Sequence, residues 1–249
     1  MKTMKISVTM SLAMIALGTM FAVADDHADS RPLFYGQSIG IVASDAPAVL
    51  DAMNKWRSTD AGKAAPNTVV LLQNIVNGDY QSTHGVNIFY ADGAAMDTSA
   101  KVLQGNKDWS EFQRTLSSLV DFEWENTYAI LRAKVNEGDV ASPNPASIVY
   151  GITVTDANVF MPAFNKLWNS EAIQNFPGTV YLGTSIAAGT MPGTHFVTFV
   201  ADSRGKLTEA IIEMQSSDEM ATYMESASES RYLEATNMFF ELKRWSNGG

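Results

Sequence analysis

The chain has 249 residues and a formal net charge of −10 at pH 7, with 17 basic against 27 acidic side chains. A surface of this charge repels phosphate backbones, which excludes nucleic acid as a partner. The sequence contains no cysteine, so disulfide staples, iron–sulfur clusters and thiol nucleophiles are excluded, and stability must come from apolar burial.

Residues 1–24 have the pattern of a secretory signal peptide. Two lysines precede an apolar run that ends near Val23, and alanines at positions 22 and 24 provide the small residues that signal peptidase requires. An uncleaved membrane anchor is the alternative, but the run is short for a membrane span. We therefore expect a periplasmic or secreted protein with no stable membrane insertion after cleavage.

A candidate metal ligand follows the expected cleavage site. Cleavage after Ala24 leaves a chain that begins Asp25-Asp26-His27. Its free amine, two amide nitrogens and the imidazole of His27 can form the square-planar nitrogen set that suits copper(II) or nickel(II). A histidine in this position by chance is the alternative. Apart from this, residues 25–36 are expected to form a flexible polar segment.

The first half of the mature chain alternates strand and helix patterns. We predict, in order, a strand at 38–43, a helix from 45 to about 60, strands at 68–76 and 86–91, a helical region at about 94–120 and a strand at 122–135. Asp45 stands before Pro47 as a helix cap. The turn residues Asn77-Gly78-Asp79 separate the two middle strands, and Gly105 is a point where the second helical region can break.

The second half of the chain repeats the first at an offset of 111 positions. At this offset Gly40-Ile41 aligns with Gly151-Ile152, and Thr83-His84 aligns with Thr194-His195. One offset held over about a hundred residues indicates an internal duplication. The second half is accordingly predicted to contain strands at 148–154, 179–187, 195–201 and 232–244, and helices at 156–168 and about 205–228.

The order strand, helix, strand, strand, helix, strand predicts two ferredoxin-like βαββαβ repeats, each an antiparallel sheet with both helices on one face. We place the first repeat at residues 37–137, a linker with two prolines at 138–146 and the second repeat at 147–246. Each sheet leaves one face open, and pressing the two sheets together would bury both. The predicted fold class is therefore α+β, with tandem ferredoxin-like repeats that form an intrachain pseudo-dimeric α+β barrel.

This element order and duplication resemble the dimeric α+β barrel superfamily, over nearly the whole mature chain from Gln37 to Trp245. No short motif assigns the chain to one family within it. The resemblance implies that the two repeats pair within one polypeptide, as in the fused members. It also implies a relation to cofactor-free monooxygenases and haem-handling enzymes, in which His84 or His195 would be the base or the ligand.

Polar residues that are identical in both repeats are the candidates for a site, because they have survived the divergence of their neighbours. Asp45 and Asp156 stand where a helix begins and are predicted to be caps. Lys55 and Lys166 stand beside apolar helix positions and are predicted to lie on solvated faces.

His84 and His195 are the strongest of these candidates. Each follows a threonine at the start of a predicted strand and shares its parity with apolar residues, so each should lie on an apolar face. An imidazole there titrates near neutrality and could act as a base, a ligand or a switch. The structural alternative is a histidine at a strand end that is bonded to the preceding turn or to a backbone carbonyl.

Two further pairs, Glu123/Glu234 and Asn126/Asn237, lie in the last strand of each repeat. A polar residue near the centre of a sheet needs partners if it is buried. These side chains could pair with histidine or line a cavity, or they could face solvent at a strand edge. Together with the two histidines they are the candidate ligand-binding residues.

No specific catalytic or metal-binding motif occurs in the sequence, such as Gly-x-Ser-x-Gly or a Gly-rich phosphate loop. Catalytic residues are therefore unassigned and no cofactor is expected, with haem and copper as the alternatives. The first hypothesis is a binding or accessory protein that holds a small apolar molecule between its two sheets. The second is a cofactor-free or haem-linked oxidoreductase, and the third is a structural scaffold that forms homo-oligomers.

Overall fold

The computed structural model describes residues 32–246, apart from 137, 139–141 and 192. The predicted signal peptide at 1–24 and the candidate copper ligand His27 lie outside these described residues. Among the described helices, none is long and apolar enough to cross a membrane.

Each half of the described chain follows the predicted order of strands and helical regions. The first half contains β1 (Phe34–Ala43), α1 (Ala46–Ser58), α2 (Asp60–Ala64), β2 (Thr68–Val76), β3 (His84–Tyr90), α3 (Gly93–Leu103), α4 (Lys107–Ser117) and β4 (Val120–Lys134). The second half contains β5 (Ala146–Val154), α6 (Ala157–Trp168), α7 (Glu171–Gln174), β6 (Thr179–Ala187), β7 (His195–Ala201), α8 (Arg204–Gln215), α9 (Asp218–Ala227) and β8 (Arg231–Trp245). The predicted α+β class with two βαββαβ repeats is confirmed.

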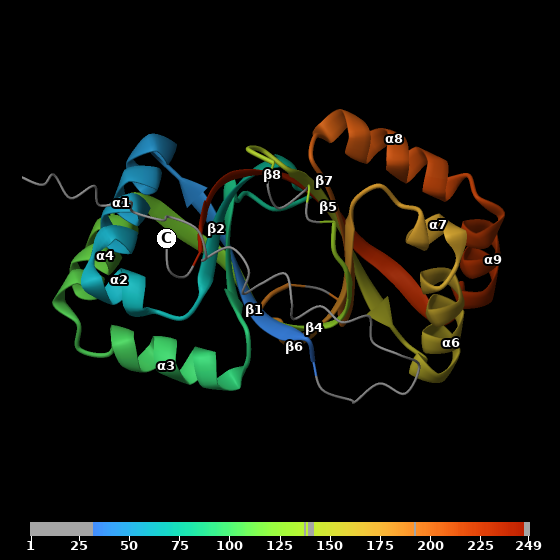
Figure 1. Ribbon diagram of the computed structural model, residues 1–249, viewed down its shortest axis with the longest axis horizontal. Coiled ribbons are helices and arrows are strands. Elements are labelled where there is room, and N and C mark those ends of the chain that lie inside the picture. Colours follow the sequence, from blue (N-terminus) through green and yellow to red (C-terminus); the bar gives the residue numbers. More distant parts are fainter. Residues whose placement is uncertain (1–31, 137, 139–141, 192, 247–249) are drawn as a thin grey trace, which may run out of the picture.

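The described strands form one closed antiparallel barrel in the order β1-β3-β2-β8-β5-β7-β6-β4. The two halves meet along two seams, where β2 pairs with β8 and β4 pairs with β6. Because neighbouring strands alternate in direction, β1 and β5 point the same way on opposite walls, and the pseudo-twofold axis runs along the barrel axis. Equivalent residues of the two halves therefore lie at the same height across the barrel. Figure 1 shows the barrel between two layers of helices.

Side-chain caps fix the starts of the first helix in each half. The carboxylate of Asp45 accepts a hydrogen bond from the backbone N–H of Ala48 at 3.0 Å, and that of Asp156 accepts one from Asn158 at 2.9 Å. These bonds satisfy amide groups that the first turn leaves unpaired. The predicted capping role of both aspartates is confirmed.

Both long helical regions of the prediction are divided into two helices. Gly105, just after α3, has a φ of +68°, a left-handed conformation that favours glycine. Asn106 then caps α4 by accepting the N–H of Trp109 at 3.0 Å. In the second half Ser217 starts α9 by accepting the N–H of Met220 at 3.1 Å. The break predicted at Gly105 is confirmed. The break before α9 was missed, because apolar periodicity continues through it and predicts one region where a cap produces two helices.

Apolar side chains form three layers. One layer lies between the helices and the sheet of the first half and includes Val49 and Leu71. Its counterpart in the second half includes Phe160 and Leu182. The third lies inside the barrel around Phe239. Each sheet is therefore covered on both faces, by its helices on one side and by the opposite sheet on the other.

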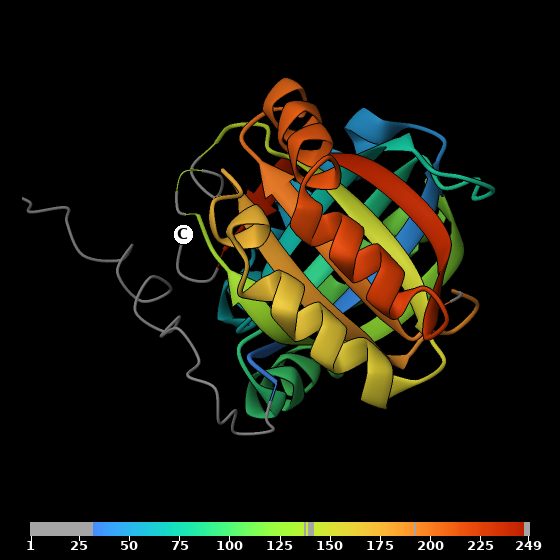
Figure 2. The ribbon, with the colours of Figure 1, turned by 90° about the vertical axis from the view of Figure 1, so that its right-hand side faces the viewer.

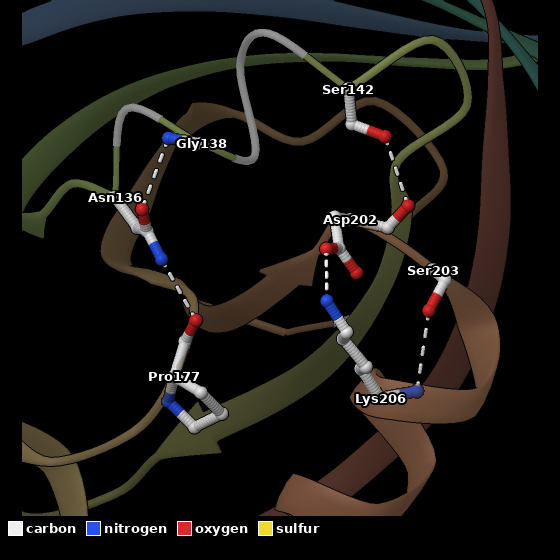
Figure 3. A network of polar contacts seen from close by, with 7 residues as sticks. All are labelled: Asn136, Gly138, Ser142, Pro177, Asp202, Ser203 and Lys206. Atoms are coloured by element: carbon white, nitrogen blue, oxygen red, sulfur yellow. Dashed lines mark hydrogen bonds and ion pairs between the residues drawn. The ribbon is translucent and has the colours of Figure 1, made fainter.

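Side-chain hydrogen bonds hold the described part of the connection between the halves against the second half (Figure 3). Asn136 donates from Nδ2 to the carbonyl oxygen of Pro177 at 2.8 Å. Ser142 donates from its hydroxyl to the carbonyl oxygen of Asp202 at 2.9 Å, and the Asp202 carboxylate forms an ion pair with Lys206. These contacts hold Asn136 and Ser142 against residues beside β6 and β7 of the second half.

Candidate functional site

The two retained histidines are the first residues of β3 and β7. The Nδ1 atom of each lies 2.9 Å from the Oγ1 atom of the preceding threonine, Thr83 or Thr194. Each alternates along its strand with apolar residues of the helix-covered layer, so both imidazoles face the helices and not the barrel interior. Burial lowers the pKa of both His84 and His195, so both rings are neutral near pH 7.

Glu123 and Glu234 occupy equivalent β-bulges. The register between β1 and β4 shifts at Glu123, and that between β5 and β8 shifts at Glu234, so each is the extra residue of its strand. The Glu123 carboxylate accepts the backbone N–H groups of Gln81 and Ser82, both at 2.6 Å. Glu234 accepts the hydroxyl of Thr153. These bonds fix the local backbone at one rim of the barrel.

Asn126 and Asn237 lie inside the barrel and are only 6% and 4% exposed. Asn237 alternates along β8 with Phe239 of the inner layer, and Asn126 is its equivalent on the opposite wall. The amide of Asn126 donates to the Ser185 hydroxyl at 3.3 Å. The Oδ1 atoms of both asparagines have no hydrogen-bond partner among the described residues. Buried oxygens of this kind call for a donor such as water or a ligand.

The six candidate residues thus fall into three places. The histidines lie under the helices of their own halves, the glutamates lie at the bulges, and the asparagines lie inside the barrel. The structure brings the two asparagines to one lumen, but it brings neither histidine to them.

His195 belongs to a cluster that sequence reasoning did not identify. Its ring centroid lies 6.0 Å from that of Phe160 on α6, which lies 6.5 Å from that of Tyr223 on α9. The Cζ atom of Arg231, the first residue of β8, lies 5.2 Å from the centroid of the Tyr223 ring. We call these four residues the aromatic cluster.

The sheet places both polar ends of the aromatic cluster on one face. His195 pairs with Ile152 of β5, and Arg231 pairs with Val154 of the same strand. Ile152 and Val154 both contact the helix-covered layer. The imidazole and the guanidinium therefore lie on either side of β5, beneath α6 and α9.

Burial shapes the electrostatics of the aromatic cluster. Desolvation raises the pKa of Tyr223, while the nearby Arg231 lowers it by a smaller amount, so the phenol stays protonated near neutral pH. The Nε atom of Arg231 is buried and has no hydrogen-bond partner among the described residues. Arg231 therefore retains an unused donor beside an aromatic face.

The first half has no equivalent of this cluster. At the offset of 111 residues, Val49 stands where the second half has Phe160, and Val120 stands where it has Arg231. Identity between the two halves therefore marks His195 but not the other residues of the aromatic cluster. The signal that would have found Phe160 and Arg231 is a difference between the halves, namely a change from an aliphatic to an aromatic or charged residue near a retained histidine.

No protein-family model matches the chain, and a search of curated proteins finds no match. Among solved structures, the chain is similar to a candidate monooxygenase from Lactobacillus acidophilus NCFM, with a TM-score of 0.55 and 13% identity over 87% of this chain and 97% of that one. It is also similar to an anthrone oxidase-like protein, with a TM-score of 0.51 and 10% identity over 88% and 96%. The fold is that of the dimeric α+β barrels.

A further similar barrel is a variant of chlorite dismutase from Candidatus Nitrospira defluvii, with a TM-score of 0.52 and 12% identity over 86% of this chain and 92% of that one. A protein from Thermus thermophilus with a TM-score of 0.49 is described as a novel heme-binding protein. The similarity to chlorite dismutase barrels contradicts the expectation that no cofactor is bound and favours the haem alternative.

The aromatic cluster fits the donor chemistry of haem. His195 is a neutral imidazole with one nitrogen held by Thr194, which suits a ligand of haem iron. Arg231, with its buried and unpaired Nε atom, suits a carboxylate. Similarity at 13% identity or less shows the fold alone.

Proposed function

We propose that this barrel protein is an exported, haem-linked oxidoreductase whose cofactor binds under the helices of the second half. The observation that supports this most is the aromatic cluster, which joins a neutral imidazole to a guanidinium at one of two equivalent positions. Solved barrels described as chlorite dismutase and as a candidate monooxygenase favour the reaction class. Export follows from the pattern of residues 1–24, and the N-terminal sequence of the secreted protein tests it.

Each member of the aromatic cluster has a role in this proposal. The Thr194 hydroxyl holds Nδ1 of His195 and thereby orients Nε2 as the iron ligand. Arg231 and the protonated Tyr223 bind one carboxylate group of the cofactor. When bound, haem supplies the electron-transfer chemistry that the chain's own side chains lack.

The helical layer must open to admit a planar ligand. Phe160 and Phe164 are 0% and 2% exposed, and their rings stack at 5.6 Å between α6 and the sheet. A ligand beside His195 would displace these rings, so α6 and α9 must move apart. The two helices lie side by side on the outer face of the second half (Figure 2).

Hemin titration of the purified protein tests the assignment. Wild type and His84→Ala are expected to give the same Soret band. His195→Ala is expected to bind at least about tenfold more weakly, with a shifted band, because the iron loses its protein ligand.

His84→Ala is a matched control, since both histidines begin equivalent strands and both are bonded to a threonine. Circular dichroism and the melting temperature establish that the variants fold. If His195→Ala gave the wild-type band and affinity, the assigned role of His195 would be refuted.

A second candidate function is the binding of a small apolar molecule between the two sheets. The observation that favours it is the pair of buried Oδ1 atoms on Asn126 and Asn237, which have no donor among the described residues. Their positions on opposite walls at one height would suit a guest that carries a hydrogen-bond donor.

A further inference from the structure

A groove separates α6 from α9 on the outer face of the second half. It encloses a cavity of about 160 Å³. Its lining includes Lys166 and Leu167 from α6, and Thr222, Tyr223 and Ser226 from α9. Tyr223 and Leu167 also belong to the apolar layer beneath. Tyr223 is therefore part of both the groove and the aromatic cluster.

Aromatic rings fill the equivalent space in the first half. Trp56 on α1 lies 5.1 Å from Trp109 and 5.9 Å from Phe112 on α4, between ring centroids. In the second half, leucine replaces Trp56 at position 167 and methionine replaces Trp109 at position 220. The loss of two indole rings accounts for the space between α6 and α9.

An ion pair joins α1 to α4 in the first half, at positions equivalent to Lys166 and Thr222 of the second. The ammonium of Lys55 lies 2.7 Å from the carboxylate of Glu111. The equivalent lysine, Lys166, is retained, but Thr222 stands at the position of Glu111. Among the described residues Lys166 forms no salt bridge. The second half therefore keeps the cation and lacks its carboxylate.

We propose that the groove between α6 and α9 binds the carboxylate end of an apolar ligand, with Lys166 as its anchor. The carboxylate takes the place that the Glu111 side chain occupies beside Lys55. The inference rests on the proposed function, because its main probe is haem, a planar apolar molecule with carboxylate groups. The cavity is smaller than the roughly 300 Å³ of a typical ligand pocket, so it holds one end of the ligand while the apolar part enters the layer beneath.

The charges around the groove limit where an anion can lie. Asp218 and Glu219 also line the groove, one turn before Thr222 on α9. They repel an anion, so the carboxylate of the ligand has to lie on the side of Lys166 that faces Thr222. In a chain with a net charge of −10, an anionic ligand needs such a local cation to overcome the overall field.

Binding of hemin and of its dimethyl ester, which has no free carboxylate, tests the proposal. Lys166→Gln removes the cation, and Thr222→Glu provides a carboxylate of the chain's own to occupy it. Both are expected to weaken hemin binding about threefold or more, as for a partly exposed ion pair, and to leave binding of the ester unchanged. Lys55→Gln is the matched control and should bind both probes like wild type.

Wild-type hemin affinity in Lys166→Gln would overturn the carboxylate groove and leave the proposed haem function standing. Equal affinity of wild type for hemin and its ester would overturn the groove and the carboxylate role of Arg231, and leave only the role of His195 standing. If hemin gave no Soret change with wild type, the haem function would fail.

Dodecanoate then tests the groove alone, with dodecanol as the uncharged control. A rise in melting temperature with dodecanoate that Lys166→Gln abolishes and Lys55→Gln retains would support the groove, and a rise unchanged in Lys166→Gln would overturn it.

Discussion

Residues that are identical in the two halves and residues that differ between them carry different information. Asp45 and Asp156 are identical because both cap a helix. Residues that differ beside a retained position indicate where one half has acquired chemistry of its own. Arg231 in place of Val120 and Thr222 in place of Glu111 are two such changes; Thr222 lies on α9 and Arg231 contacts Tyr223 of the same helix.

The buried histidines are expected to make the protein less stable in acid. Burial lowers the pKa of His84 and His195 in the folded state below the usual 6.5. As the pH falls through 6.5, the unfolded chain binds more protons than the folded one. The free energy of unfolding therefore declines until the folded-state pKa is passed, where the loss levels off.

Urea unfolding between about pH 7.5 and about pH 5 measures this slope. The variant His84→Ala/His195→Ala should show a smaller decline over that range than wild type. The same decline in the double variant would refute the assignment of the slope to the histidines.

The bounds of individual helices and strands were predicted where residues close in sequence determine them. The strand at 195–201 has the predicted bounds. The face of each histidine was not predictable, because alternation with Val197 shows only that His195 faces an apolar layer. Both faces of each sheet are covered here, so parity cannot distinguish the helix side from the barrel interior. The bulge at Glu123 was missed because an extra residue is visible only against its partner strand.

Glu123 is expected to stabilise the loop between β2 and β3. Its carboxylate accepts two backbone N–H groups at 2.6 Å, and Glu123→Gln can accept only one of them. We expect a loss of about 1–2 kcal/mol in the free energy of unfolding, as for hydrogen bonds to a charged group. Urea unfolding of Glu123→Gln measures it. Glu234→Gln, which loses part of one bond to a hydroxyl, should lose less, and equal losses would contradict this account.

At the scale of the whole molecule, closure of the barrel brings together side chains that neither half holds alone. The two seams bring Asn126 and Asn237 to opposite walls of one lumen. The helix-covered layers, in contrast, are complete within each half. A function at His195 therefore needs only the second half, whereas a function between the sheets needs both.

Thermal unfolding with indole, an apolar molecule with one N–H donor, tests the lumen directly. We expect indole to raise the melting temperature of wild type, because either buried Oδ1 atom can accept its N–H. Asn126→Leu/Asn237→Leu should abolish this rise while folding at least as well without indole, since it removes two unpaired buried oxygens. Asn165→Leu is the control, because it removes another buried oxygen without a partner among the described residues, on α6 outside the barrel. A rise that persists in the double variant would place the indole elsewhere, and no rise in wild type would count against a donor-bearing guest in the lumen.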